Sequence, residues 1–262
     1  MPELLDIHHG FNFRDLGGYR TTAGAIVAPK RLVRASKLAD LSPRDETYLR
    51  DYGVVAAVDF RSPAERQAAP DRIPRGVAYH EEPVFAYDET AVSDWAAQQR
   101  AFAQAADAGY RNMVRTYADM ITNPQSQAAY RQLFDLLLDT RSGAVLFHCS
   151  AGKDRTGMGA VFILAALGVP EATIRQDYLL TNRYVTATAA AVVAQAKASG
   201  ANANTQASLH DLWVARGAYL DSALATVSAH YGSLAHYLSA ALDLTDAQVA
   251  RLRQLYLLPA AD

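Results

Sequence analysis

A single segment, residues 148–157, constrains the fold of this 262-residue chain more than any other. It reads His-Cys-Ser-Ala-Gly-Lys-Asp-Arg-Thr-Gly and contains the only cysteine, Cys149. An apolar run at 144–147 precedes it, and a second apolar run follows it and ends at Gly168, with Pro170 beyond. This order predicts a strand, a tight loop and a helix. Such a loop directs backbone N–H groups and the positive end of the helix dipole at one small volume, which suits an oxyanion.

The chain before this segment alternates between helix and strand signals. Residues 42–53 begin with Ser-Pro-Arg-Asp and end with glycine, the pattern of a capped helix, and the apolar run after them predicts a strand that ends at Asp59. Residues 123–137 begin with Asn-Pro and repeat leucine at helical spacing, while residues 95–121 read as helical with a break near residue 109. We therefore expect an α/β fold in which helices flank a central, mostly parallel sheet.

The chain after residue 170 reads as helical throughout. The expected elements are a helix from 170, an alanine-rich stretch at 188–198, a loop at 200–204, one long helix from about Ser208 to His230, and a last helix capped by Thr245 with Gln248. Because 50% of the residues are apolar, the chain can bury a large core. We expect residues 1–262 to form a single domain.

Cys149 and Arg155 are the candidate catalytic pair. They lie close enough in sequence that a loop curled around one anion can place the sulfur beneath it and the guanidinium beside it. A helix N-terminus and a nearby cation can lower a cysteine pKa from about 8.5 to roughly 3.5–7.5, which provides a thiolate at neutral pH. Arg155 offers a planar fork that matches two phosphate oxygens. The pattern predicts attack of Cys149 on a phosphate monoester and hydrolysis of the cysteinyl-phosphate by water, without metal or cofactor.

The other residues of the segment have supporting roles in this hypothesis. The residues expected to hold the substrate or a phosphate ion in the loop are His148, Ser150, Ala151, Gly152 and Lys153. Thr156 can help the thiolate to leave in the second step, and His148 is expected to orient the loop from behind. Gly152 and Gly157 lack a Cβ, which allows close backbone approach. Lys153 adds a second cation at the mouth of the loop.

Two other interpretations of the segment are weaker. A free cysteine is usually a small buried hydrophobe, but the glycines, the Arg155-Thr156 pair and the flanking strand and helix signals together favour catalysis. A nucleotide-binding P-loop is excluded, because Asp154 follows Lys153 where that motif needs Ser or Thr, and Phe147 stands where it needs glycine.

The segment resembles the signature of the protein tyrosine phosphatase superfamily, His-Cys-x5-Arg followed by Ser or Thr. Two further motifs resemble those of its bacterial branch, Asn-Phe-Arg-Asp-Leu-Gly-Gly-Tyr at 12–19 and Asp-Phe-Arg at 59–61. All three occur in the family order, and the resemblance covers about residues 8–185. It implies a cysteine phosphatase fold, and activity on phosphotyrosine, phosphoserine or phosphothreonine proteins, on phosphoinositides, or on both.

The resemblance has two further implications. The Ala-Gly-Lys portion is also similar to lipid phosphatases related to tensin, in which a lysine at the place of Lys153 contacts extra phosphates of an inositol ring. Generic charge complementarity would place a lysine here equally well. In the related bacterial phosphatases a helical lid can cover the active site, and residues 185–205 are the candidate lid segment here, with an ordinary surface helix pair as the alternative.

The general acid is open between two aspartates, since the chain has no Trp-Pro-Asp segment of the kind that many tyrosine phosphatases use. Asp59 ends a predicted strand whose carboxyl end opens onto the same crevice as the loop. Asp154 lies in the loop itself, and we prefer it because the Lys-Asp-Arg triplet distinguishes the bacterial branch. Either aspartate could instead make a structural ion pair.

The two other motifs supply candidate supporting residues. Arg14 is expected to reach the phosphate loop, and Asp15 to brace a backbone near the Gly-Gly turn that follows. Arg61, which is followed by Glu65 and Arg66, is a further candidate contact to the substrate. Without the resemblance, these residues would be interpreted as solvated ion pairs in surface turns.

Composition limits the partners and the location. A net charge of −2 provides no broad basic surface for nucleic acid, and the single cysteine excludes an internal disulfide without excluding export. The N-terminus lacks the regions of a signal peptide, and no run of about 18 apolar residues indicates a membrane span. We expect a soluble protein, cytoplasmic or exported without a classical signal peptide, whose partner is a phosphorylated protein or phosphoinositide. The histidines show no metal-ligand spacing.

Two functions of other classes stay open. A phosphate-binding pseudophosphatase would hold a phosphorylated partner without turnover, although binding alone does not need the cysteine nucleophile. A thiol sulfurtransferase also places its active cysteine in a strand-to-helix loop. The Arg155-Thr156 pair and Lys153 favour phosphate over sulfane sulfur.

Overall fold

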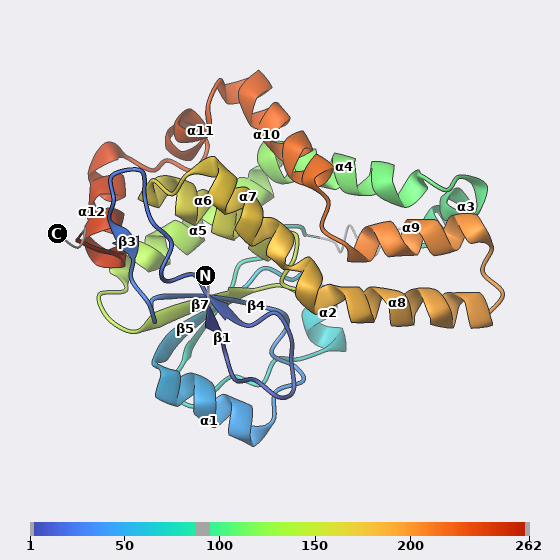
Figure 1. Ribbon diagram of the computed structural model, residues 1–262, viewed down its shortest axis with the longest axis horizontal. Helices are drawn as coiled ribbons and strands as arrows, with labels where there is room; N and C mark the ends of the chain where they lie inside the picture. The colour runs from blue at the N-terminus through green and yellow to red at the C-terminus, as the bar shows by residue number, and fades with distance from the viewer. Residues whose placement is uncertain (1–2, 87–94, 260–262) are drawn as a thin grey trace.

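The computed structural model describes residues 3–86 and 95–259, which form a six-stranded, mostly parallel sheet with helices on both faces (Figure 1). In spatial order the strands are β1 (Glu3–Leu4), β2 (Arg14–Asp15), β4 (Leu32–Ala35), β7 (Ala144–His148), β5 (Val54–Asp59) and β6 (Ala78–Glu81). The last four run parallel, and β1 and β2 add an antiparallel edge. The expected α/β class is confirmed.

Helices cover the sheet unequally. In chain order they are α1 (Pro43–Tyr52), α2 (Pro63–Ala68), α3 (Trp95–Gln104), α4 (Ala108–Thr122), α5 (Pro124–Asp139), α6 (Arg155–Leu167), α7 (Glu171–Leu180), α8 (Asn182–Ala198), α9 (Ala203–Trp213), α10 (Gly217–Tyr231), α11 (Leu234–Ala240) and α12 (Asp246–Tyr256). Helix α1 lies on one face of the sheet, while α5, α6 and α12 pack on the other (Figure 1). A separate two-stranded sheet joins β3 (Ile26–Val27) to β8 (Leu257–Leu258).

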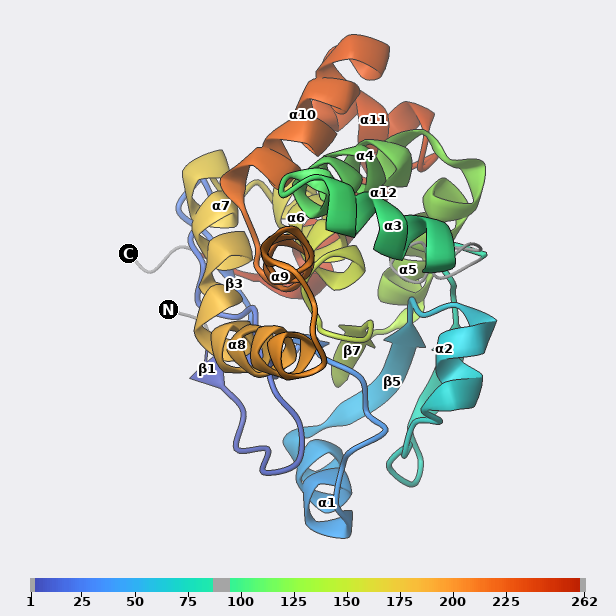
Figure 2. The ribbon, with the colours of Figure 1, turned by 90° about the vertical axis from the view of Figure 1, so that its right-hand side faces the viewer.

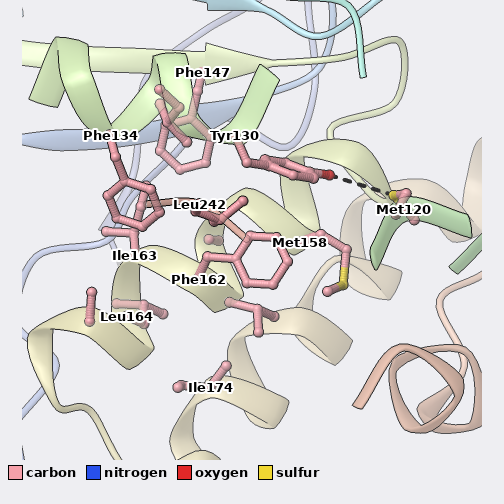
Figure 3. Packing of buried hydrophobic residues seen from close by; sticks show 14 of the residues in the cluster. Met120, Tyr130, Phe134, Phe147, Met158, Phe162, Ile163, Leu164, Ile174 and Leu242 are labelled. Atoms are coloured by element: carbon pink, nitrogen blue, oxygen red, sulfur yellow. Dashed lines mark hydrogen bonds between the residues drawn. The ribbon is translucent and has the colours of Figure 1, made fainter. Parts of the chain in front are cut away.

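The central strand β7 divides two hydrophobic cores. Val145 and Phe147 face the larger core with α5 and α6, while Ala144 and Leu146 face the smaller core with α1. Figure 3 shows the larger core around Phe162, whose ring packs edge-on against that of Tyr130 with the centroids 4.9 Å apart. Because both faces are covered, the strand is a continuous apolar run with no polar alternation. This burial fixes the end of β7, where the phosphate loop begins.

The predicted helix ends are confirmed. Ser42 and Asp45 form a capping box at the start of α1, and Gly53 ends this helix in the left-handed region, at φ 103°. Asn123 caps α5 through its side chain, and Gly168 ends α6 at φ 86°. The strand, loop and helix expected around residues 144–167 are therefore all present.

The expected single helix over 208–230 is wrong, because the chain breaks between α9 and α10. Asn182 of α8 binds both backbone groups of Ala215: its Oδ1 accepts from the N–H and its Nδ2 donates to the carbonyl, each at 2.8 Å. These tertiary bonds replace helical ones at the break. Helix α9 also begins earlier than expected, at Ala203, where the side chain of Asn202 caps it inside the predicted loop.

Three smaller expectations about helices are corrected. The break expected near residue 109 lies between α3 and α4, and Gly109 is inside α4. A Cβ on Gly109 would lie 2.3 Å from the Ser208 carbonyl oxygen, so this glycine serves the close contact of α4 with α9. The region after residue 170 is not entirely helical, because β8 follows α12, and α11 was not expected.

Within the described ranges, no helix combines the length and apolar character needed to cross a bilayer.

Candidate active site

The phosphate loop, residues 149–154, lies at the carboxyl end of β7, between the ends of β4 and β5. His148 is in register with Ala35 on one side and with Asp59 on the other. Helix α6 begins at Arg155, so its N-terminus faces the loop. Cys149 is 1% exposed. The arrangement has the strand, loop and helix geometry that binds an anion.

Gly152 allows the loop to turn. It adopts φ +64°, and a Cβ there would lie 2.4 Å from the carbonyl oxygen of Ala35. Its own carbonyl accepts from Asn12 Nδ2 at 2.9 Å and from Arg34 Nη2 at 2.8 Å. Asn12 Nδ2 also reaches the carbonyl of Ala151, at 3.3 Å. Because these carbonyls are held from the strand side, the loop amides are available for an anion on the other side.

Arg155 is held by Glu65 of α2 through two parallel hydrogen bonds. Arg155 Nη1 donates to Glu65 Oε2 at 2.6 Å, and Nη2 donates to Oε1 at 2.8 Å. Ser150 Oγ also donates to Glu65. Burial by itself would raise the pKa of Glu65, but the bonds and charge of Arg155 lower it to about 2. The carboxylate therefore stays ionised and fixes the guanidinium in the loop that holds Cys149.

Asp154 accepts two hydrogen bonds on one oxygen. Lys153 Nζ donates to Asp154 Oδ1 at 2.5 Å, and Tyr117 of α4 donates to the same atom at 2.7 Å. Tyr178 of α7 in turn donates to the hydroxyl of Tyr117 at 2.9 Å. Lys153 is buried, while Asp154 is partly exposed at the surface of the loop. Neither bond uses the second carboxylate oxygen, Oδ2.

Thr156 and Tyr130 lie behind the loop at the start of α6. The hydroxyl of Tyr130 donates to the Arg155 carbonyl at 3.0 Å. Thr156 Oγ1 is buried without a hydrogen-bond partner among the described residues. A buried hydroxyl with unused bonding capacity is costly unless a ligand or water completes it.

Two buried charge clusters flank the loop, one on each side of β7. On the β4 side, the Asp177 cluster comprises Arg14, Arg34 and Asp177. Arg34 Nη1 donates to Asp177 Oδ2 at 2.6 Å, and Arg14 Nη1 donates to Oδ1. Tyr19 and Thr181 complete the hydrogen bonds. Burial and the charge of Arg34 lower the pKa of Arg14, whereas the two arginines overcome burial and lower that of Asp177.

On the β5 side, the Asp59 cluster comprises Asp59, Arg61, Asp71 and His148. Arg61 Nη2 lies 2.7 Å from Asp59 Oδ2 and 2.7 Å from Asp71 Oδ2. Nε2 of His148 lies 3.2 Å from the same Asp71 oxygen. Burial would raise the pKa of Asp59, but His148 and Arg61 hold it well below its usual range. The carboxylates and the imidazole lie close enough for a metal ion, yet the Arg61 guanidinium already supplies the positive charge between them.

The structure brings together most of the residues singled out in the sequence. The loop residues lie around Cys149, and Asp15 braces backbone as expected, accepting from the N–H groups of Gly17 and Lys30. Arg14 and Arg61 are fully buried beside carboxylates. Gly157 is not a site of close approach, because the nearest atom to a Cβ there is at 3.4 Å, an ordinary contact.

Several contacts of the loop were missed in the sequence. They come from Asn12, Arg34, Glu65 and Tyr117, and Asp177 holds Arg34 in place. Glu65 follows Ser62 by three residues, a capping-box pattern that indicates a helix start but not the bond to Arg155. The other contacts join segments up to 140 residues apart, and no local pattern indicates them.

Comparison with known proteins agrees with this geometry. The model of the tyrosine phosphatase family matches residues 5–258. This chain belongs to the tyrosine phosphatase family. A predicted tyrosine-protein phosphatase of Cupriavidus necator is 33% identical over 250 residues, which cover 94% of this chain and 85% of the relative. The triple specificity protein phosphatase PtpB of Mycobacterium tuberculosis is 30% identical over 280 residues, which cover 97% and 99%.

Two further matches are weaker. A tyrosine-protein phosphatase of Nostoc commune is 29% identical over 153 residues, which cover 58% of this chain and 49% of its own. A crystal structure of TpbA from P. aeruginosa aligns with 79% of this chain and 91% of its own, at 17% identity and a TM-score of 0.29. The first two relatives therefore carry the family assignment.

Proposed function

We propose that this protein is a cysteine-dependent phosphomonoester hydrolase that acts on phosphotyrosine in proteins. The observation that carries the proposal is the pair of hydrogen bonds by which Glu65 holds Arg155, the first residue of the helix that follows the Cys149 loop. A fixed, planar guanidinium beside a nucleophile at a helix N-terminus matches the charge and shape of a phosphoryl group. Membership of the tyrosine phosphatase family supports the same reaction.

In the first step, Cys149 Sγ attacks the phosphorus as a thiolate. The S–P bond forms as the bond from phosphorus to the ester oxygen breaks, and the leaving oxygen takes a proton from Asp154. The loop amides and Arg155 neutralise the charge on the three remaining phosphoryl oxygens. The products of this step are the free alcohol or phenol and a cysteinyl-phosphate.

In the second step, a water molecule attacks the cysteinyl-phosphate. Asp154, now ionised, takes a proton from the water, the new O–P bond forms, and the S–P bond breaks to release inorganic phosphate. Thr156 Oγ1 has the unused hydrogen bond that a departing thiolate needs. This completes the cycle without metal or redox chemistry.

The contacts support Asp154 over Asp59 as the acid. Asp59 accepts from Arg61 Nε and Nη2 and from Tyr79, so its oxygens are occupied in a buried site. Asp154 is partly exposed at the loop and receives its two bonds on a single oxygen. A proton can be carried and delivered on the other oxygen, Oδ2.

The substrate range is proposed to include phosphoserine and phosphothreonine, because one relative is named a triple specificity phosphatase. Phosphoinositides are the second candidate, and Lys153 is the observation in their favour. Its ammonium is buried against Asp154, so an additional phosphate would have to draw it away from that carboxylate. Because of this cost, we expect phosphoinositides to be poorer substrates than phosphotyrosine.

The remaining predicted site residues are proposed to position the loop. His148, Arg14 and Arg61 are fully buried and paired with carboxylates, which suits support more than direct substrate contact. Residues 185–205, which span most of α8 and the start of α9, stay the candidate lid (Figure 2). The single-domain arrangement of residues 1–262 is part of the same proposal.

Phosphate release without added metal tests this function. The substrates are a phosphotyrosine peptide, a phosphoserine peptide and a panel of phosphoinositides, with Cys149→Ser as the control. We expect release from the phosphotyrosine peptide that is lost in the control while phosphate binding is kept. Binding without release would instead support a pseudophosphatase, and thiocyanate formation from thiosulfate and cyanide would support a sulfurtransferase.

A further inference from the structure

We propose that the Asp177 cluster is a buried positive charge that tunes the phosphate loop, with Arg34 and Asp177 as positioning residues for Cys149. The inference rests on the proposed function, because it concerns the same nucleophile. Two guanidinium groups, Arg14 and Arg34, share the one carboxylate of Asp177, and all three side chains are at most 1% exposed. The cluster therefore carries one excess positive charge in a region of low dielectric constant.

The other charges that face the loop largely cancel. Lys153 pairs with Asp154 and Arg155 with Glu65 from α2, whereas Arg61 faces two carboxylates, Asp59 and Asp71, so the β5 side has no excess positive charge. The titratable groups closest to these pairs are His148, at the end of β7, and the hydroxyls of Tyr79, Tyr130 and Tyr117. Burial raises the pKa of all three tyrosines well above the ordinary value, so they are neutral. Among the described residues around the loop, the excess positive charge is on the β4 side.

The cluster touches the loop directly. Arg34 uses Nη1 for Asp177 and Nη2 for the Gly152 carbonyl, at 2.6 and 2.8 Å. One side chain therefore connects a buried carboxylate to the loop backbone. A third hydrogen bond also holds the Arg34 guanidinium in place, because the hydroxyl of Thr181 accepts from Nη2 at 3.3 Å. The charge acts on the loop from a fixed place, which is how a preorganised site stabilises an anion.

The three side chains allow charge and backbone contact to be separated. Arg34→Gln removes one positive charge and the bond to Gly152, while Arg14→Gln removes the same charge and keeps that bond. Asp177→Asn removes the negative charge and leaves two arginines. The arginine variants should make the thiolate harder to form, and the aspartate variant should make it easier. A purely structural role would move all three in one direction.

The experiment is alkylation of the native protein by iodoacetamide as a function of pH. Cys149 is the only cysteine, so the rate reports on its thiolate and requires no turnover. For a unit charge at a separation of about 10 Å and an effective dielectric constant of about 20, Coulomb's law gives a shift of roughly one pH unit in the midpoint. We expect higher midpoints in Arg34→Gln and Arg14→Gln, and a lower midpoint in Asp177→Asn.

Binding of inorganic phosphate, measured by calorimetry, gives the second readout. Phosphate affinity should fall in both arginine variants, and further in Arg34→Gln, which also loses the Gly152 contact. Asp45→Asn is the matched control, because Asp45 is a buried, arginine-paired carboxylate on α1. It should leave the alkylation midpoint where it is in the wild-type protein.

Unchanged midpoints in the folded variants, or shifts of one sign for all of them, would overturn the inference. Should Asp177→Asn fail to fold, Arg14→Gln decides by itself, because it retains a neutral Arg34–Asp177 pair and the loop contact. Phosphate release by the wild-type protein tests the proposed function separately. A wild-type protein that releases phosphate while Arg14→Gln keeps its midpoint would contradict only the inference.

Discussion

The two charge clusters beside β7 have opposite compositions. The Asp177 cluster has two arginines for one carboxylate, and the Asp59 cluster has two carboxylates for one arginine and a histidine. Both are buried, and both lie at the carboxyl ends of strands next to the phosphate loop. Their contacts differ, because Arg34 bonds to the loop carbonyl of Gly152, whereas Arg61 bonds to Ala69, in the segment after α2.

This difference separates two uses of a buried ion pair. Arg61 is needed where it is because two carboxylates would otherwise be unpaired, so the Asp59 cluster organises the strand ends and the start of α2. The Asp177 cluster leaves a positive charge over, and this charge lies next to the anion-binding loop. Both clusters are buried, so burial does not distinguish them. The net charge of each cluster therefore indicates which of the two acts on the loop that holds Cys149.

The largest expected effect comes from removing one arginine from each cluster. Arg61→Met leaves Asp59 and Asp71 together without a cation, and we expect a loss of about 3–5 kcal/mol in the free energy of unfolding. Arg34→Met leaves the neutral Arg14–Asp177 pair and should lose less than half as much. Urea denaturation at neutral pH measures both. Equal losses would show that the two clusters do not differ in the way their charges indicate.

A third buried ion pair, Glu65 with Arg155, lies at the loop itself and can be compared with the two clusters. Its pKa is lowered to about 2 in the folded protein, so its contribution is complete above the unfolded value, about 4.3, and is lost as the pH falls towards 2. We expect the wild-type protein to lose about 3 kcal/mol more than Glu65→Gln does between pH 5 and pH 2, in the same denaturation series. Parallel pH profiles for the two proteins would contradict the ionised Glu65–Arg155 pair.

Asp154 and Asp59 should differ most clearly in kinetics. Asp154→Asn should slow the hydrolysis of esters with poor leaving groups by about 100-fold and of activated aryl esters far less, since only the former need a proton. Asp59→Asn should lower stability and slow both ester types alike. The measurement is kcat/KM against leaving-group pKa, and a steeper dependence in Asp59→Asn would reverse the assignment.

The smallest effect is expected at Tyr117, which positions Asp154. Tyr117→Phe removes one hydrogen bond to the carboxylate and should cost about 1 kcal/mol of unfolding free energy. It should also slow poor leaving groups by about fivefold, which corresponds to a similar energy. Tyr178→Phe is the control, because it keeps the bond to Asp154 and should leave the leaving-group dependence unchanged.

Local signals predicted the elements that carry the loop. The apolar run at 144–147, the helix ending at Gly168 and the capping box of Ser42 with Asp45 were all confirmed. The prediction was wrong where long-range contacts compete with helix propensity. At Ala215 the backbone forms hydrogen bonds with Asn182 instead of continuing the predicted helix. Gly109 is a second example. Glycine is needed at this position because Ser208, on another helix, lies too close for a Cβ.

In the candidate site, too, the local residues could be predicted from the sequence and the long-range contacts could not. The loop residues follow from one contiguous segment, so their proximity needed only a strand and a helix. Arg34 and Asp177 occur in no motif, and they meet only because β4 lies beside β7 and the fold brings α7 next to Arg34. Charge clusters of this kind depend on topology, which the sequence pattern does not specify in such detail.

Trapping the covalent intermediate is the most direct test of the cysteine mechanism. Wild-type protein is mixed with a phosphotyrosine peptide, quenched in acid within the first turnover, and digested for mass spectrometry. We predict one phosphoryl group on the peptide that contains Cys149, and none on that peptide in Cys149→Ser. Phosphate release without any phosphoryl group on Cys149, or with the group on another residue, would contradict the mechanism.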